Sequence, residues 1–328
     1  MALSARAERH RLREPFRISR IEITHSQMLV AELAADGRVG RGECEPHESD
    51  AALAAQALRD MQALAPRFAQ GVSREELNRL LPAGPIRNAL DCALWDLQAK
   101  LTGTPVAQLA GLPAPRPLPT VFTLGIGDPQ VGASKARALA DWTRFKVKLG
   151  GVEAARDLER VQAIHAARPD AELIVDANGG WSLALLQRLA PALAELGVKL
   201  IEQPLLPGAD EALAGYASPV PLCADESCLD RGSLARVLGR YQYVNIKLDK
   251  TGGLTEALAL ATEARQAGLG LMVGCMTGTS LAMAPAHLVA QQARFIDLDG
   301  PMLLAEDRPH GMRYQNGIVF PAERELWG

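Results

Sequence analysis

Four charged residues recur at regular intervals along the chain, each at the end of a short apolar run. They are Asp176, Glu202, Asp225 and Lys247, and successive members lie 26, 23 and 22 residues apart. This interval is typical of one strand–helix unit, so the four side chains are expected to converge at one edge of a parallel sheet. Burying a charge there is unfavourable unless it is paired. Any one carboxylate alone is more typical of a helix cap, but three in succession favour a functional site.

The three carboxylates predict a metal. At one depth they would repel one another unless a cation neutralised them. Mg²⁺ suits such a set, because it takes a few carboxylate oxygens together with water and substrate. The set contains no His or Cys, which disfavours zinc. We therefore expect Asp176, Glu202 and Asp225 to hold Mg²⁺.

Lysines flank these carboxylates in the order of the chain. Lys146 and Lys148 alternate with apolar residues, so both project from the same side of the predicted strand. Lys148 and Lys247 lie on strands to either side of the metal-bearing ones. An unperturbed lysine, with a pKa of ~10.4, is a poor base at neutral pH. We expect burial, the metal and the Lys146 ammonium to lower the pKa of the working lysine. A solvated charge or a phosphate contact is the alternative for the Lys146–Lys148 segment.

Together these groups specify a reaction class. A metal that holds a substrate carboxylate stabilises the enediolate formed when the neighbouring α-proton leaves. One lysine removes that proton and the other returns a proton from the opposite face. The product then has the inverted configuration at that carbon.

The elements that must position these groups are eight short β-branched or apolar runs between residues 121 and 298, separated by amphipathic helical segments. This alternation indicates right-handed βαβ units and a parallel sheet. Eight strands suffice for a closed barrel, although an open doubly wound sheet shows the same alternation. Gly125-Ile126-Gly127 leads into an Asp-Pro turn, so a dinucleotide site is disfavoured.

The first 115 residues have a different pattern. Strand-like segments come first, with a hairpin turn at Asp36-Gly37, and helical segments follow from Asp50 onward. This predicts a separate α+β domain over residues 1–115. The proline-dense segment 112–119 is expected to link it to a barrel over residues 116–304.

Composition excludes several classes of function. Lys and Arg total 35 against 38 Asp and Glu, a net charge of −3, which does not favour binding to nucleic acid. No apolar run approaches the ~20 residues of a membrane helix, and the N-terminus lacks the apolar core of a secretory signal. Five cysteines without a CxxC pair are typical of a reduced, cytoplasmic protein. The expected partner is a small molecule, and a homo-oligomer remains open.

Five segments resemble the enolase superfamily, in its muconate-lactonizing subgroup. The resemblance covers essentially the whole chain and implies an α/β fold: a (β/α)7β TIM-like barrel with an N-terminal α+β capping domain, joined by the tail at about 305–328. It also implies that Asp176, Glu202 and Asp225 bind Mg²⁺ and that Lys148 and Lys247 are the acid/base pair. The segments are KVK (146–148), DANGGW (176–181), EQP (202–204), ADES (224–227) and NIKLDKTGGLTEAL (245–258).

A narrower resemblance, to bacterial dipeptide epimerases, rests on residues 81–100, 223–228 and 297–301. Asp297 and Asp299 lie two apart at the end of the last strand, so both face the same way and suit an ammonium group. In that group of enzymes the pair holds the free α-amine of the substrate. A helix cap and a turn would explain only one of the two. Positions that line the substrate in the group are matched by Thr123, Lys146 and Cys275.

The resemblance implies epimerisation of L-Ala-D/L-Glu from murein peptides, at the α-carbon of the C-terminal residue. A glutamate side chain in the substrate would need a cation, and Arg20, in the loop over residues 16–27, is the candidate by bidentate pairing. A solvated surface position is an equal alternative for Arg20. Ile21, Ile23 and Thr24 depart from the arginine- and serine-rich pattern expected there. The identity of the second residue is therefore open.

Other activities on the same scaffold remain open: a dipeptide epimerase of different specificity, a cycloisomerase, an o-succinylbenzoate synthase or an N-succinylamino acid racemase. The substrates of the last three carry no ammonium group and leave Asp297 and Asp299 unexplained. A catalytically silent metal-binding or scaffolding protein is disfavoured, because loss of catalysis usually leaves a gap among the carboxylates and lysines.

Overall fold

The computed structural model describes residues 1–19, 21–46, 50–150 and 156–328. A three-stranded antiparallel sheet in the order β1-β2-β3 opens the chain. Asp36 and Gly37 both have positive φ and form the predicted turn between the second and third strands. The three strands are β1 (Ala2–Arg17), β2 (Glu22–Ala35) and β3 (Arg38–Cys44).

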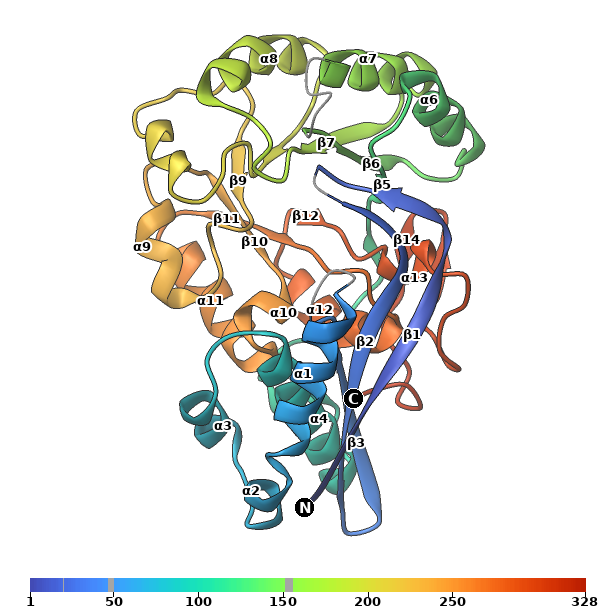
Figure 1. Cartoon of the computed structure of the whole chain (residues 1–328), viewed down its shortest axis with the longest axis vertical. Coiled ribbons are helices and arrows are strands. Elements are labelled where there is room, and N and C mark those ends of the chain that lie inside the picture. The colour runs from blue at the N-terminus through green and yellow to red at the C-terminus, as the bar shows by residue number, and fades with distance from the viewer. Residues whose placement is uncertain (20, 47–49, 151–155) are drawn as a thin grey trace.

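Helices cover one face of this sheet (Figure 1). Leu29, Ala31 and Leu33 of β2 are fully buried against them and form the centre of a separate hydrophobic cluster. The longest helix begins at Pro85, where the missing N–H needs no partner, and ends before Gly103 in the left-handed conformation. The helices are α1 (Ala51–Gln62), α2 (Ala65–Ala69), α3 (Arg74–Leu80), α4 (Pro85–Thr102) and α5 (Val106–Leu109).

The second unit is a parallel sheet of eight strands whose spatial order follows their order in the chain. Val121 N donates to Ile296 O at 3.0 Å and links the first strand to the last. This connection confirms the predicted barrel and excludes the open doubly wound sheet. The strands are β5 (Phe122–Leu124), β6 (Arg144–Lys148), β7 (Glu172–Asp176), β8 (Ile201–Glu202), β9 (Leu222–Ala224), β10 (Tyr243–Ile246), β11 (Gly270–Val273) and β12 (Phe295–Ile296).

Helices follow these strands on the outside of the barrel (Figure 1). The connection from β8 to β9 is an exception, since it uses the 3₁₀-helix η2 (Ala209–Leu213), and η3 (Arg231–Ser233) precedes α9. A separate apolar cluster contributed by several strands includes Ile174, Cys223 and Met272. The helices are α6 (Pro129–Ala138), α7 (Asp157–Ala167), α8 (Leu183–Glu195), α9 (Leu234–Val237), α10 (Leu248–Thr251), α11 (Leu254–Gln266), α12 (Ser280–Ala290) and α13 (Gly300–Leu303).

The C-terminal tail runs back to the N-terminal unit, and both chain ends lie at the same end of the molecule (Figure 1). Arg41 of β3 donates to Glu325 O at 2.7 Å, and Gly328 N donates to Asp96 of α4 at 2.8 Å. The proline-dense segment ends in a strand, β4 (Leu118–Pro119), which pairs with the tail strand β14 (Ile318–Val319), itself paired with β13 (Tyr314–Gln315). The domain boundary at residue 115 stays a prediction. Among the described residues, no helix has the length and apolarity needed to cross a bilayer.

Strand β3 lies directly against helix α4, with glycines at the contact. A Cβ atom added to Gly42 would lie 2.0 Å from Ala89 O, and one added to Gly40 would lie 2.2 Å from Ala93 O. Because both obstacles are backbone atoms of a helix, neither can move aside locally. The glycines therefore set how closely α4 approaches the sheet.

We expect Gly42→Ala to lower the free energy of unfolding by about 1–3 kcal/mol, because the added methyl group forces strand and helix apart. Urea unfolding followed by circular dichroism measures the change. Gly127→Ala is the matched control, since its Cβ meets nothing within 4 Å. A Gly42→Ala protein as stable as the wild type would contradict this account of the contact.

Candidate active site

The predicted side chains in the described part of the chain gather at the carboxyl ends of the barrel strands. Lys148 ends the second of eight strands and Lys247 directly follows the sixth, so they face each other across the mouth of the barrel. The carboxylates come from the three strands between them. The positions are Thr123 in β5, Lys146 and Lys148 in β6, Asp176 at the end of β7, Glu202 at the end of β8, Asp225 after β9, Lys247 after β10, Cys275 after β11, and Asp297 and Asp299 after β12.

Strand register explains the alignment of the first three groups. Lys148 pairs with Asp176, and Asp176 pairs with Glu202, in the parallel ladder. Glu202 pairs with Cys223, two residues before Asp225, so both carboxylates project from the same side of the sheet. All three carboxylates are buried.

Lysine ammonium groups neutralise the carboxylates in this structure. Lys148 Nζ lies 2.6 Å from Asp176 Oδ2, and Lys247 Nζ lies 2.6 Å from Asp225 Oδ2. Lys146 is completely buried and bridges the row, with its Nζ 3.0 Å from Asp176, 2.7 Å from Glu202 and 2.7 Å from Asp297.

These neighbours push the pKa values of the carboxyl groups apart. Burial raises the pKa of Asp176, but Lys148 and Lys146 outweigh it and lower the pKa to about 2. Asp225 behaves in the same way: Lys247 and Lys250 outweigh burial and lower its pKa. Burial and the Asp176 carboxylate raise the pKa of Glu202 to about 7. Glu202 therefore has the strongest need for further positive charge.

The donor set fits a hard dication. It offers carboxylate oxygens from three adjacent strands, and Glu202 Oε2 accepts no hydrogen bond from the described residues although Lys146 Nζ lies 2.7 Å away. Among the described residues, no three His, Cys, Asp or Glu side chains lie in an arrangement that could already hold a metal ion. Mg²⁺ on Asp176, Glu202 and Asp225 stays a prediction.

Opposing effects act on the pKa of Lys247 in this structure, and its lowering by a bound dication stays a prediction. Burial and the Lys146 ammonium lower its pKa, but the carboxylates of Asp225, Glu202 and Glu226 together raise it above its usual value. The pKa of Lys146 is likewise raised, since Asp297 and Glu202 outweigh burial. Both lysines are therefore ammonium ions here, which suits a proton donor.

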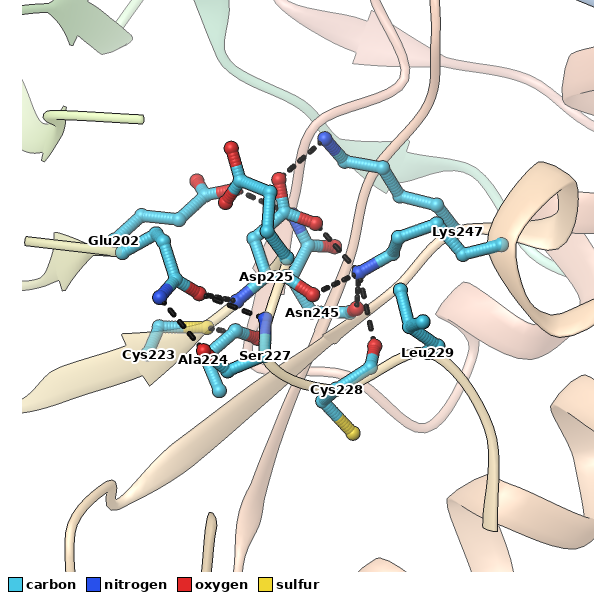
Figure 2. Close-up of polar contacts among 12 residues, drawn as sticks. Glu202, Cys223, Ala224, Asp225, Ser227, Cys228, Leu229, Asn245 and Lys247 are labelled. Atoms are coloured by element: carbon cyan, nitrogen blue, oxygen red, sulfur yellow. Dashed lines mark hydrogen bonds and ion pairs between the residues drawn. The ribbon is translucent and has the colours of Figure 1, made fainter. Parts of the chain in front are cut away.

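Sequence reasoning missed several polar residues of the site. Asn245 donates from Nδ2 to Glu202 Oε1 at 2.7 Å, and it precedes Lys247 by two residues, so the alternation of side chains along the strand could have identified it. Figure 2 shows Asp225 between Glu202 on one side and Lys247 on the other, with Asn245 close by. Lys250 donates to both Asp225 O and Asp225 Oδ1 at 2.5 Å.

Asn178 and Glu226 were also missed, although both lie in segments that carried the family resemblance. Lys148 Nζ donates to Asn178 Oδ1 at 3.1 Å, and Asn178 Nδ2 donates to Glu226 Oε1 at 3.2 Å. Both residues line the same pocket as Lys148 and Lys247. Nothing in their spacing would have distinguished them from turn residues.

Asp297 and Asp299 do lie together, and both meet Thr123. Thr123 N donates to Asp299 Oδ2 at 2.6 Å, and Thr123 Oγ1 donates to Asp297 Oδ1 at 3.3 Å. Asp299 precedes α13 but makes no side-chain cap to it, so the helix-cap alternative does not account for its carboxylate. Burial and the Asp297 charge raise the pKa of Asp299 to about 7, and a cation between the two would relieve that repulsion. Cys275 lines the same pocket.

The N-terminal unit supplies the opposite wall of this pocket. Phe16, Ile18 and Ile23 form its apolar part, and Glu45 lies beside them. Glu45 is buried and accepts hydrogen bonds from Ser26 Oγ at 3.1 Å and from Thr277 N at 3.2 Å, which joins this wall to the barrel. Arg20, predicted to read a glutamate side chain, lies outside the described residues.

Two family matches cover the chain, one over the barrel and one over the N-terminal unit. Residues 131–323 match the enolase C-terminal domain-like family, and residues 2–111 match the N-terminal domain of mandelate racemase / muconate lactonizing enzyme. The chain therefore belongs to the enolase superfamily, within the mandelate racemase and muconate lactonizing enzyme group.

Among its relatives, the L-Ala-D/L-Glu epimerase of Escherichia coli K12 is 46% identical over 312 residues, covering 93% of this chain and 95% of the relative. The N-acetyl-D-glutamate racemase of a Pseudoalteromonas species is 47% identical over 261 residues, covering 80% of this chain and 82% of the relative.

Two solved structures are similar over almost their whole length. An enolase family member from Agrobacterium tumefaciens, with homology to dipeptide epimerases and with bound sodium and L-Ala-L-Glu, is 44% identical at a TM-score of 0.94, covering 99% of each chain. The dipeptide epimerase of Methylococcus capsulatus, complexed with Mg and L-Arg-D-Lys, is 32% identical at a TM-score of 0.86, covering 98% of this chain and 97% of that one.

Proposed function

We propose that this chain is a Mg²⁺-dependent dipeptide epimerase that inverts the α-carbon of the C-terminal residue, with L-Ala-D/L-Glu as its substrate. One observation carries the proposal: Lys148 and Lys247 face each other across a pocket that also holds the Asp297/Asp299 pair. The dipeptide epimerases among its relatives support it.

The two lysines would move the proton. One lysine, as a free amine, takes the α-proton of the C-terminal residue, and the opposite lysine, as an ammonium ion, returns a proton to the other face. When bound, Mg²⁺ supplies positive charge that stabilises the enediolate. Asp176, Glu202 and Asp225 would hold that ion, and the Lys146 ammonium, in contact with two of them, adds positive charge beside the substrate carboxylate.

The Asp297/Asp299 pair would orient the substrate. Two carboxylates that share the Thr123 contact are suited to an ammonium ion, which relieves their repulsion and fixes the amino end of a dipeptide. The C-terminal residue then extends toward the lysines, and its side chain faces the wall of Phe16, Ile18 and Ile23. Arg20 remains the proposed partner of a glutamate side chain.

An N-acyl amino acid racemase is the second candidate, favoured by the N-acetyl-D-glutamate racemase among the relatives. An N-acetylated glutamate carries no ammonium ion, so it would add no cation to the Asp297/Asp299 pair, in which Lys146 contacts Asp297. We therefore place it below the dipeptide. We also propose a role in murein peptide turnover in the cytoplasm, which the five free cysteines support.

Mg²⁺ should stabilise the protein against heat. At a Mg²⁺ concentration 100 times its Kd, ligand binding adds about 2.7 kcal/mol to the free energy of unfolding, and Asp225→Asn should lose most of that gain. Thermal melts of chelator-treated protein with and without Mg²⁺ measure it. Asp210→Asn is the control, since Asp210 is also buried but contacts Ser227 and Tyr241 and belongs to the β8–β9 connection. An Mg²⁺ effect unchanged in Asp225→Asn would contradict the assigned site.

Lys148→Ala and Lys247→Ala should each reduce the rate of epimerisation at least 1000-fold. Each variant should still exchange the α-proton of one epimer with D₂O, and the epimer that exchanges should differ between the two variants. The reason is that each lysine serves one face of the α-carbon. Proton NMR of L-Ala-L-Glu and L-Ala-D-Glu, incubated separately, measures both quantities. The exposed Lys199→Ala should match the wild type. Loss of exchange from the same epimer in both variants would refute the two-base mechanism.

The ammonium pair gives a test between the two candidates. We expect kcat/KM for L-Ala-L-Glu to exceed that for N-acetyl-L-glutamate by 100-fold or more. Asp299→Asn, which leaves the Lys146–Asp297 ion pair in place, should reduce only the dipeptide value strongly. Steady-state rates from polarimetry or chiral chromatography measure both substrates. Equal rates on the two compounds would favour the racemase instead.

A further inference from the structure

Helix α4 of the N-terminal unit contacts the segment that follows Lys247. Arg87, Asn88, Asp91 and Trp95 lie on one face of α4, at the spacing of successive helical turns. The segment they meet comprises the single turn α10 and the start of α11. The two partners are far apart in the chain, since Asn88 and Asp249 are 161 positions apart.

The contact nearest Lys247 is made by a buried carboxylate, that of Asp249. Its Oδ1 accepts from Asn88 Nδ2 at 3.0 Å and from Glu45 N at 3.3 Å. Burial raises the pKa of Asp249 to about 7, while these two hydrogen bonds lower it. The carboxylate two residues after Lys247 is thus held by two donors of the N-terminal unit.

The next turn is held through its backbone. Arg87 donates to Thr251 O at 2.5 Å and to Gly252 O at 3.1 Å. Asp91 accepts from Thr255 N at 2.9 Å and from Thr255 Oγ1 at 2.6 Å. A Cβ on Gly252 would lie 2.3 Å from Arg87 Nε, and Gly252 has a positive φ of 79° that favours glycine. The chain therefore lies directly against α4.

This contact acts on one lysine of the proposed pair. Lys247 lies between Ile246, which pairs with Val273 in the barrel ladder, and α10. Its carbonyl accepts from Lys250 N and Thr251 N, both at 3.0 Å, so α10 fixes the side of the Lys247 backbone that the ladder leaves unpaired. Lys148 takes its position from the barrel ladder instead, where it pairs with Asp176. A shift of α10 against α4 would displace Lys247 and leave the β6 ladder in place.

We propose that Asn88, with Arg87 and Asp91, is a positioning set that aims Lys247 at the substrate, so that α4 governs proton transfer on one face of the α-carbon. The inference rests on the proposed function, because it assumes that Lys247 serves one face and Lys148 the other. None of the three residues is a catalytic residue, since they act through α10 and not on the substrate.

Deuterium exchange measured separately for the two epimers tests this. Lys148→Ala and Lys247→Ala first assign each epimer to its lysine. Asn88→Ala should then slow exchange of the epimer assigned to Lys247 tenfold or more, while exchange of the other stays within twofold of the wild type. Asp249→Asn, which keeps an acceptor oxygen, should retain the wild-type ratio of the two rates, and Asp249→Ala should lose it.

Asp96→Ala is the matched control. Asp96 lies on the same helix and is equally buried, but it accepts from Arg41 N and Gly328 N, both at 2.8 Å, on the side of the C-terminal tail. Asp96→Ala should change the deuterium exchange rates of both epimers in the same proportion. If Asn88→Ala does not fold, Asp91→Asn is measured in its place with the same expectation.

Equal slowing of both epimers in Asn88→Ala, or no change in either, would overturn the inference and leave α4 a structural role alone. A failure of the proposed function is distinguishable from that result. In that case the wild type exchanges neither epimer, or the two lysine variants do not divide the epimers between them, and both proposals fall together.

Discussion

The buried carboxylates of Asp176, Glu202 and Asp225 lie side by side at the ends of three adjacent strands. Their mutual repulsion must be offset for the barrel to fold. Four lysine ammonium groups, those of Lys146, Lys148, Lys247 and Lys250, supply that compensation, and Lys146 does so from a completely buried position. Removing one partner from such a cluster leaves an uncompensated buried charge, which is strongly destabilising. The same arrangement that stabilises the fold therefore gathers the groups that would bind a dication and transfer protons.

The N-terminal unit takes part in this arrangement from two directions. Phe16 and Ile23 close the pocket over the barrel mouth, while α4 lies against the segment after Lys247. Gly40 and Gly42 allow α4 to approach β3 closely, so the helix that contacts α10 is itself seated directly on the sheet. The apolar wall of the pocket and the contact with α10 thus both come from the N-terminal unit.

Much of the barrel could be predicted because its signals are local. Charges spaced by one strand–helix unit indicate a shared edge of the sheet, and lysines two apart on a strand indicate a shared side. The contact of Asn245 with Glu202 could not be predicted in the same way, since it joins strands β8 and β10 across β9 and depends on the curvature of the closed sheet. The Asn88–Asp249 contact and the apolar wall depend on how two units dock. Spacing also does not reveal that Asp225 lies 2.6 Å from Lys247 and acts to raise the pKa of that lysine.

Lys148 and Lys247 lie half a turn apart around the barrel, and this separation bears on the direction in which the proposed reaction would run. An enzyme with a proton-transferring group on each face of its substrate would let either epimer enter the reaction. The two epimers of a dipeptide differ little in free energy, so such an enzyme brings them to comparable concentrations and can drive neither to completion. The net direction of the reaction would be set by whichever stereospecific hydrolase removes one epimer, while the barrel would interconvert the two epimers in both directions.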